Sequence, residues 1–241
     1  MVGASLWLTG TVVSAESATP SGRILMVDVP GWPGNLAGQH LDLRLTAEDG
    51  YQAVRSYSIA SVGSATTIEL AVDELPDGEV SPYLVRDVQP GDQLEVRGPL
   101  GGYFVWRETQ PEPVQLIAGG SGVVPLMAMS RAHHRTGSTA PFRLLYSVRT
   151  PENAYFTDEL AGFESDSFRL DWVYTRSAPE GWPAAPGRLM RDTLEAAAIP
   201  AEQQPTVYVC GPTGFVEAAS RLLLDLGHEE ARVRTERFGG Y

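Results

Sequence analysis

The chain has 241 residues, of which 43% are hydrophobic and 20% charged, a composition typical of a soluble globular protein. Its formal net charge is −12, and all 18 basic residues are arginines because the sequence contains no lysine. This acidic balance disfavours nucleic-acid binding, which depends on neutralising phosphates. No apolar run approaches the ~18 residues of a membrane span, and the amino terminus lacks the features of a secretory signal. We therefore expect a cytoplasmic protein.

Cysteine and histidine usage argues against a metal site. The single cysteine, Cys210, excludes an internal disulfide and an iron–sulfur cluster held by four thiolates of this chain. The four histidines show no ligand spacing with Cys210, so we expect no zinc site. We expect the histidines to be exposed polar residues.

Short apolar or alternating runs fill the first half of the chain, separated by turns rich in Gly, Pro, Asn and Asp. The runs cover residues 6–13, 23–29, 40–45, 54–59, 67–72 and 93–97, and one helical turn is expected at 81–85. Many short strands at such spacing predict an all-β barrel or sandwich.

From residue 110 onward, apolar runs alternate with helical patterns. A polar, proline-marked stretch at 107–113 precedes them, so we place a domain boundary between residues 109 and 110. The predicted strands are 114–118, 143–147, 169–175, 206–210 and 232–235, and the predicted helices are 124–135, 157–161, 188–198 and 213–226. This alternation indicates a doubly wound parallel sheet, whose ligands bind beyond the carboxyl ends of the strands.

One predicted strand of the first half carries Arg55, Ser56, Tyr57 and Ser58 in succession. Because alternate residues of a strand share a face, Arg55 and Tyr57 point to one side, and the two serines point to the other. A guanidinium can hold a diphosphate through two hydrogen bonds, and a phenol ring can stack on a flavin. The run predicts a flavin-binding strand, and an amphipathic strand with a core tyrosine is the alternative.

A second candidate element contains Gly78, Val80 and Ser81, followed by Pro82. The serine and proline are typical of a helix start, with Ser81 as the N-cap and Pro82 at the first helical position. A helix N-terminus with free amide groups also binds anions, and this one would hold a diphosphate from the side opposite Arg55. Both interpretations remain open.

In the second half, Gly120, Ser121, Gly122 and Pro125 follow a buried strand and open a helix. Glycines at this point let the backbone approach a pyrophosphate. Pro125 replaces the third glycine of the standard dinucleotide fingerprint, so a simple tight turn is the alternative.

Two later strand ends carry further candidates. Ser147, Arg149 and Arg176 offer a hydroxyl and two guanidiniums, which suit a ribose phosphate, although loop arginines are commonly solvated surface residues. The run Cys210-Gly211-Pro212 ends a central strand where a nicotinamide would lie, although a cysteine there is commonly an inert buried residue.

With these residues in place, the chain resembles the ferredoxin-NADP reductase superfamily over essentially its full length. Residues 55–58 match the family's flavin motif, 78–81 its second diphosphate element, and 120–125 its nicotinamide-dinucleotide motif. Residues 210–212 and 236–239 match the remaining two motifs. Several motifs in family order are far more specific than any one of them.

The resemblance implies an N-terminal antiparallel β-barrel that binds FAD, residues 1–109, and a C-terminal α/β domain that binds NAD(P)H, residues 110–241. Arg55 would bind the diphosphate, Tyr57 would stack on the flavin, and the Ser58 hydroxyl would lie near flavin N5. Cys210 and Glu236 would lie beside the nicotinamide. Ser58, Cys210 and Glu236 are then the expected catalytic residues, and Phe238 is a further expected cofactor contact.

The implied activity is transfer of hydride from NADPH or NADH to FAD, followed by transfer of single electrons to a separate ferredoxin, oxygenase component or haem protein. The branch that the chain most resembles, the reductase part of bacterial oxygenase systems, often carries a cysteine-rich ferredoxin domain that this sequence lacks. Arg149 and Arg176 favour NADPH over NADH. We expect a monomer. The alternatives are a free-flavin or quinone reductase and a non-catalytic flavin-binding module that senses redox state.

Overall fold

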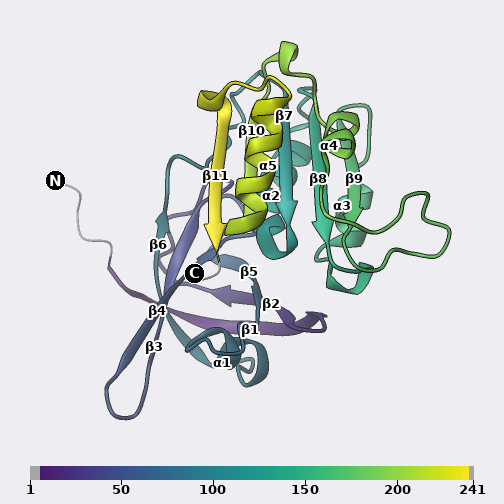
Figure 1. Ribbon diagram of the computed structural model, residues 1–241. Helices are drawn as coiled ribbons and strands as arrows, with labels where there is room; N and C mark the ends of the chain where they lie inside the picture. The colour runs from purple at the N-terminus through teal and green to yellow at the C-terminus, as the bar shows by residue number, and fades with distance from the viewer. Residues whose placement is uncertain (1–5, 239–241) are drawn as a thin grey trace. The chain divides into compact units, whose positions relative to one another are not determined.

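The computed structural model describes residues 6–238, and its contacts divide the chain into two compact units (Figure 1). Unit 1 comprises residues 1–106 and unit 2 residues 107–241. The expected boundary between residues 109 and 110 lies a few residues beyond this division. Within the described part of the chain, no helix combines the length and apolar character that crossing a membrane requires.

Unit 1 is a six-stranded antiparallel sheet with the strand order β4-β3-β6-β1-β2-β5. Its elements are β1 (Leu8–Thr19), β2 (Gly22–Asp28), β3 (His40–Thr46), β4 (Gln52–Ser58), β5 (Thr67–Asp73), α1 (Ser81–Arg86) and β6 (Gln93–Leu100). A bridge between Ile59 and Leu70 joins the region of the two edge strands, so the sheet curls into a barrel. The predicted antiparallel barrel is confirmed.

Strand β1 is longer than its apolar pattern predicts. Its polar second half, beyond residue 13, pairs with β2, and a tight turn after Thr19 connects the two strands. Backbone pairing extends this strand where side-chain burial does not, so hydrophobic periodicity alone missed the extension.

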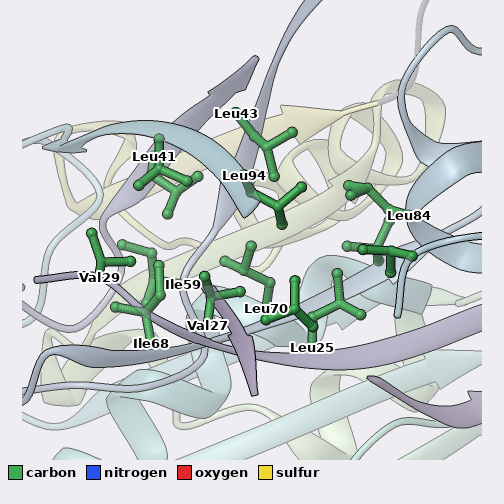
Figure 2. Close-up of a cluster of buried hydrophobic side chains, with 14 of the residues drawn as sticks. Leu25, Val27, Val29, Leu41, Leu43, Ile59, Ile68, Leu70, Leu84 and Leu94 are labelled. Atoms are coloured by element: carbon green, nitrogen blue, oxygen red, sulfur yellow. The ribbon is translucent and has the colours of Figure 1, made fainter. Parts of the chain in front are cut away.

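Alternating side chains of the strands form the core of unit 1. Leu25 and Val27 of β2 are fully buried, whereas Met26 between them is partly exposed. Figure 2 shows these side chains meeting Leu41, Leu43, Leu70 and Leu84, which come from β3, β5 and α1. Each fully buried aliphatic side chain contributes about 1.5–3 kcal/mol, so this cluster fixes which face of each neighbouring strand turns inward.

Unit 2 is a five-stranded parallel sheet with the strand order β11-β10-β7-β8-β9, flanked by helices (Figure 1). Its strands are β7 (Val114–Gly119), β8 (Phe142–Val148), β9 (Phe168–Tyr174), β10 (Thr206–Pro212) and β11 (Val233–Phe238). Its α-helices are α2 (Val123–Thr136), α3 (Thr157–Gly162), α4 (Arg191–Ala197) and α5 (Thr213–Asp225). Short 3-10 turns lie at η1 (Gly120–Gly122), η2 (Pro151–Asn153), η3 (Ala201–Gln203) and η4 (Glu230–Arg232). Every residue of β7 is buried, as expected of a central parallel strand covered on both faces, and the doubly wound prediction is confirmed.

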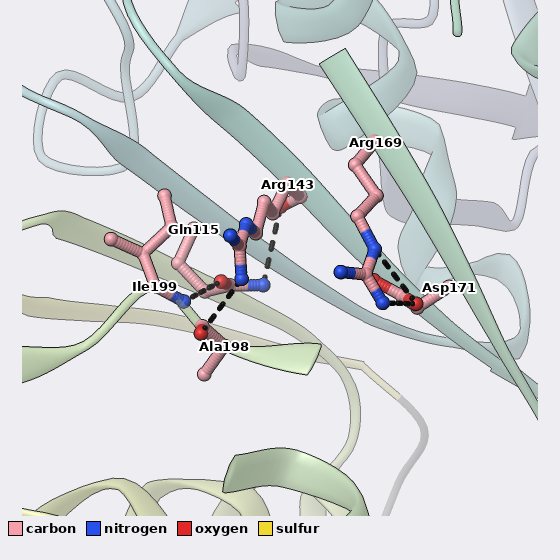
Figure 3. Close-up of polar contacts among 6 residues, drawn as sticks. All are labelled: Gln115, Arg143, Arg169, Asp171, Ala198 and Ile199. Carbon is pink, nitrogen blue, oxygen red and sulfur yellow. Dashed lines mark hydrogen bonds and ion pairs between the residues drawn. The ribbon is translucent and has the colours of Figure 1, made fainter. Parts of the chain in front are cut away.

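A buried glutamine ties the loop after α4 to the sheet of unit 2. The Gln115 side chain accepts a hydrogen bond from the Ile199 amide at 2.8 Å and donates one to the Arg143 carbonyl at 3.2 Å (Figure 3). Arg143 in turn donates to the Ala198 carbonyl at 3.0 Å. These bonds satisfy polar groups that would be costly to bury alone. They fix the connection between α4 and the strand β10 that carries candidate site residues.

Two histidines depart from the expectation that all four are exposed. His133 is 3% exposed and His228 is 6% exposed. The His133 ring stacks on Phe142 at a centroid distance of 4.1 Å, and its Nε2 lies 2.9 Å from the Ala140 carbonyl oxygen. Burial lowers the pKa of both side chains. The expectation is wrong for His133 because the end of α2 packs this histidine against β8. It is wrong for His228 because this residue is buried directly after α5, where its amide donates to the Leu223 carbonyl at 3.0 Å. No group of three or more His, Cys, Asp or Glu side chains within residues 6–238 is arranged to hold a metal ion.

Candidate functional site

The register between β3 and β4 separates the side chains of the predicted flavin strand. Tyr57 pairs with Leu41 and Arg55 with Leu43, and both leucines belong to the core. Ser56 pairs with Asp42 and donates a hydrogen bond to that carboxylate at 2.7 Å. Arg55 and Tyr57 therefore share the inward-turned face of β4, while the serines occupy the opposite face.

Tyr57 and Ser58 lie at the end of β4 and are both partly buried. Tyr57 packs against the core cluster, and this burial raises the pKa of its phenol, so the ring stays neutral at physiological pH. Ser58 pairs with His40, whose pKa is lowered by burial. The aromatic ring is thus anchored by the barrel, and a hydroxyl follows it directly.

The guanidinium of Arg55 is engaged by the chain itself. Its Nη2 forms an ion pair with Glu79, and its Nη1 donates to the Val54 carbonyl at 2.8 Å. The Tyr51 hydroxyl donates to the same Glu79 carboxylate at 2.7 Å. The hydrogen bond from Tyr51, which has the larger effect, and the one from Arg55 hold the pKa of Glu79 below its ordinary value.

Sequence reasoning missed Tyr51 and Glu79. Glu79 lies inside the 78–81 motif, where only the backbone amides and the Ser81 hydroxyl were considered as ligands of a diphosphate. The signal that could have identified Glu79 is a carboxylate inside a predicted diphosphate-binding element.

The 78–81 segment closes into a compact loop. The Gly78 amide donates to the Leu75 carbonyl at 2.8 Å, and the Leu75 amide donates to the Ser81 hydroxyl at 2.9 Å. A Cβ at Gly78 would lie 2.9 Å from the Leu75 carbonyl oxygen, so this turn needs glycine. The residue at the N-cap of α1 is Val80, which is fully buried. The predicted N-cap Ser81 is therefore wrong, because its hydroxyl serves Leu75 instead of the first helical turn.

A pocket of about 710 Å³ opens in unit 1 among β1, β3, β4, β6 and α1. Tyr51, Glu79 and Tyr83 are among its lining residues, whereas Arg55 and Tyr57 are not. The Tyr51 and Glu79 side chains thus belong both to the pocket wall and to the cluster around the arginine. The predicted flavin contacts themselves lie outside this pocket.

In unit 2, the candidate residues gather at the carboxyl edge of the parallel sheet. Cys210 of β10 pairs with Ala118 of β7 on one side and with Glu236 of β11 on the other. Gly119 at the end of β7 pairs with Ser147 of β8. Neighbouring strand ends thus bring together residues from separate stretches of sequence.

The glycines of the 119–122 segment have different roles. A Cβ at Gly122 would overlap the carbonyl oxygen of Cys210, and a Cβ at Gly119 would lie 2.6 Å from the Phe215 ring. These two glycines allow β7, η1, β10 and α5 to pack closely. Gly120 has a φ of +56° and nothing within 4 Å of where its Cβ would be, so its open backbone is accessible to a ligand.

The other members of this loop and of β10 complete the edge. Ser121 is partly exposed, and Pro125 is buried within the first turn of α2. Gly211 of β10 lies so close to the end of β7 that its Cβ would be 3.1 Å from the Gly119 Cα. Pro212 is the N-cap of α5 and pairs with Phe238, while Gly239, the last residue of the fifth motif, lies outside the described residues.

Cys210 and Glu236 form a pair of titratable groups with altered proton affinity. Cys210 is fully buried, and burial together with the nearby Glu236 charge raises the pKa of its thiol well above the ordinary value. Burial also raises the pKa of Glu236 to about 7. The thiol therefore remains protonated at neutral pH, while the carboxyl group changes charge close to neutrality.

Arg149 and Arg176 follow neighbouring strands and are linked through the backbone. The Arg176 amide donates to the Arg149 carbonyl at 2.9 Å, and both side chains are exposed. Within residues 6–238, neither guanidinium forms an ion pair with an acidic side chain. Buried Ser147 lies on the same edge. Two cations are thus presented together at the ends of β8 and β9.

Two family models match the chain. Residues 10–105 match an oxidoreductase FAD-binding domain, and residues 116–221 match an oxidoreductase NAD-binding domain. The first match lies within unit 1 and the second within unit 2. An FAD-binding β-barrel domain joined to an NAD-binding parallel-sheet domain defines a class of oxidoreductases that bind FAD and a nicotinamide dinucleotide.

Individual relatives agree with this class. The chain is 33% identical to the glycine betaine monooxygenase reductase subunit of Chromohalobacter salexigens over 84% of its own length and 55% of that protein. It is 31% identical to NADH-cytochrome b5 reductase 1 of Aspergillus oryzae, over 85% of this chain and 72% of that one. A crystal structure of a cytochrome P450 reductase from Amycolatopsis superposes with a TM-score of 0.83 at 26% identity, covering 97% of this chain and 70% of the other. The chain belongs to the ferredoxin-NADP reductase superfamily.

Proposed function

We propose that this protein is an FAD-dependent NAD(P)H reductase that passes single electrons from the flavin to a separate redox protein. The observation that carries the proposal is the grouping of Cys210, Glu236 and the open Gly120 backbone at the carboxyl edge of the sheet of unit 2, which contains the matched NAD-binding domain. The names of the relatives, a monooxygenase reductase subunit and a cytochrome b5 reductase, support a protein acceptor. Bound FAD supplies the chemistry that converts a two-electron hydride into single electrons.

The residues of unit 1 fit a flavin with a diphosphate, and we assign residues 1–109 to this role. Arg55 offers an exposed guanidinium, Tyr57 an anchored neutral ring, and Ser58 a hydroxyl at the next position of the chain. In the proposed complex, Arg55 and the 78–81 loop hold the diphosphate, and Tyr57 stacks on the flavin. Ser58 orients the reactive edge near N5, and orientation is the main contribution that a protein makes to hydride transfer.

We assign residues 110–241, which lie within unit 2, to binding of the dinucleotide. The backbone of Gly120, Ser121 and Gly122 leads into α2, whose N-terminus favours a pyrophosphate. Cys210 and Glu236 then lie beside the nicotinamide, with Pro212 and Phe238 next to them on β10 and β11. The protonated thiol keeps negative charge away from the ring, and the carboxyl group supplies it as pH rises.

The strand ends favour NADPH. Ser147, Arg149 and Arg176 suit the 2′-phosphate of NADPH, whereas enzymes that select NADH typically offer an acid to the ribose. One of the relatives is named for NADH, and the proposed preference for NADPH would distinguish this chain from it. We further propose a cytoplasmic monomer whose electron acceptor is a ferredoxin, an oxygenase component or a haem protein.

The visible spectrum of the purified protein tests the proposal. We expect a yellow protein with about one FAD per chain, identified by extraction and chromatography, that bleaches on anaerobic addition of NADPH and then reduces ferricyanide. Loss of all flavin on gel filtration, with reduction of added free flavin, would instead support a free-flavin reductase. Retained flavin that NADPH does not reduce would support a redox-sensing module.

A further inference from the structure

Glu79 connects two segments of unit 1 that are distant in sequence. It lies in the loop between β5 and α1, and it binds Arg55 of β4, 24 residues earlier, together with the Tyr51 hydroxyl just before that strand. The side chains of Arg55 and Glu79 are 50% and 45% exposed, so the pair is open to a competing anion.

The two terminal nitrogens of Arg55 are both occupied by acceptors from the chain. Nη2 is paired with Glu79, and Nη1 donates to the Val54 carbonyl at 2.8 Å. A guanidinium binds a phosphate best when both branches of its fork are available to it. A diphosphate that binds both Nη1 and Nη2 of Arg55 therefore competes with the Glu79 carboxylate for Nη2, and the carboxylate also repels it from within the 78–81 loop.

We propose that Glu79 is an internal competitor for Arg55 that weakens the binding of phosphorylated flavins and so sets how readily the protein exchanges FAD. This inference rests on the proposed function and adds a residue that determines affinity at that site. Tyr51 positions the competitor, because its hydroxyl fixes the carboxylate toward the arginine.

The competition should affect only flavins that carry phosphate. FAD and FMN carry phosphate, and riboflavin carries none, so Glu79 affects the first two and not the third. A structural disturbance of β4 or of the 78–81 loop would change the affinity for all three flavins alike.

The experiment is a titration of flavin-depleted full-length protein with FAD and, separately, with riboflavin. The quenching of flavin fluorescence measures binding and gives the Kd. Glu79→Gln should lower the Kd for FAD about 3- to 10-fold, a range set by the modest strength of exposed ion pairs. Arg55→Ala should raise the FAD Kd by about tenfold or more. Both variants should leave the riboflavin Kd within about twofold of wild type. The effect of Glu79→Gln should shrink in the Arg55→Ala background, since the competition needs both partners.

Glu74→Gln is the matched control. It removes the same charge from the same connection, but Glu74 pairs with Arg86 and not with Arg55. It should leave the FAD Kd unchanged. Equal effects of the two glutamine variants would overturn the proposal in favour of long-range electrostatics, and an unchanged or raised FAD Kd in Glu79→Gln would also overturn it. A wild-type protein that binds no FAD at all would refute the proposed function itself.

Discussion

Cys210 of β10 lies directly opposite Glu236 of β11 in the parallel sheet, so a fully buried thiol and a partly buried carboxyl group share one edge. Burial shifts the proton affinity of both groups upward. We therefore expect stability and the proposed hydride transfer to depend on pH near neutrality.

The contribution of Glu236 to stability should fall as pH rises through 7. The pKa of this carboxyl group is raised from 4.5 to about 7 by folding, so its contribution is fully present below pH 4.5 and is lost as pH rises through 7. Glu236→Gln should remove up to about 3 kcal/mol of this pH dependence. Urea unfolding at pH 5 and pH 8 measures it. If Glu236→Gln raised the free energy of unfolding by the same amount at both pH values, Glu236 would not be the source of the pH dependence.

The rate of flavin reduction by NADPH should rise with pH around 7. Departure of hydride leaves positive charge on the nicotinamide, and an ionised Glu236 beside the ring would stabilise it. The Glu236→Gln variant should react about tenfold more slowly at pH 8, which corresponds to ~1.4 kcal/mol in the barrier, and its rate should not follow this pH profile. Anaerobic stopped-flow absorbance gives the rates. A wild-type profile without an inflection near pH 7 would remove Glu236 from the reaction.

Ser58→Ala and Cys210→Ala should each slow hydride transfer while leaving the fold intact. Each removes a small polar atom from a site proposed to orient the reacting rings, and misplaced orientation costs about 10- to 100-fold. Ser17→Ala, at an exposed position of β1, is the control and should react like wild type. Circular dichroism establishes folding and stopped-flow spectroscopy the rate. Wild-type rates in both variants would exclude these residues from catalysis.

NADPH should be preferred over NADH in kcat/KM. A charge-assisted hydrogen bond contributes ~1.5–3 kcal/mol, so one productive arginine gives roughly a 10- to 100-fold preference, reduced by solvent exposure. The double variant Arg149→Ala, Arg176→Ala should lose most of this preference, whereas Arg169→Ala, an exposed arginine at the amino end of β9, should keep it. Steady-state kinetics with both dinucleotides decides. A wild-type preference for NADH would show that the two arginines serve another purpose.

Gly122→Ala should destabilise unit 2 severely. The added methyl group would overlap the Cys210 carbonyl, and relieving that overlap requires backbone movement costing about 3 kcal/mol or more. Gly214→Ala is the control, because Gly214 lies in the first turn of α5 with nothing within 4 Å of a new Cβ. It should be neutral or slightly stabilising. Thermal unfolding compares the two, and similar melting temperatures would contradict the close packing of η1 on β10.

The sequence by itself determined the order and type of the elements, because hydrophobic periodicity follows directly from which faces are buried. Strand alternation likewise predicted that Arg55 and Tyr57 share a face, and the register with Leu41 and Leu43 agrees. Local patterns set these properties, so no knowledge of distant contacts was needed.

Only the tertiary structure decided how distant residues act on one another. The ion pair of Arg55 with Glu79 depends on where the loop after β5 meets β4, and no local pattern encodes that meeting. The need for glycine at position 122 comes from the close approach of β10. The pKa of Glu236 depends on its desolvation at the sheet edge. Charge pairing, steric overlap and burial all act over a few ångströms in space, and the fold alone brings these residues that close.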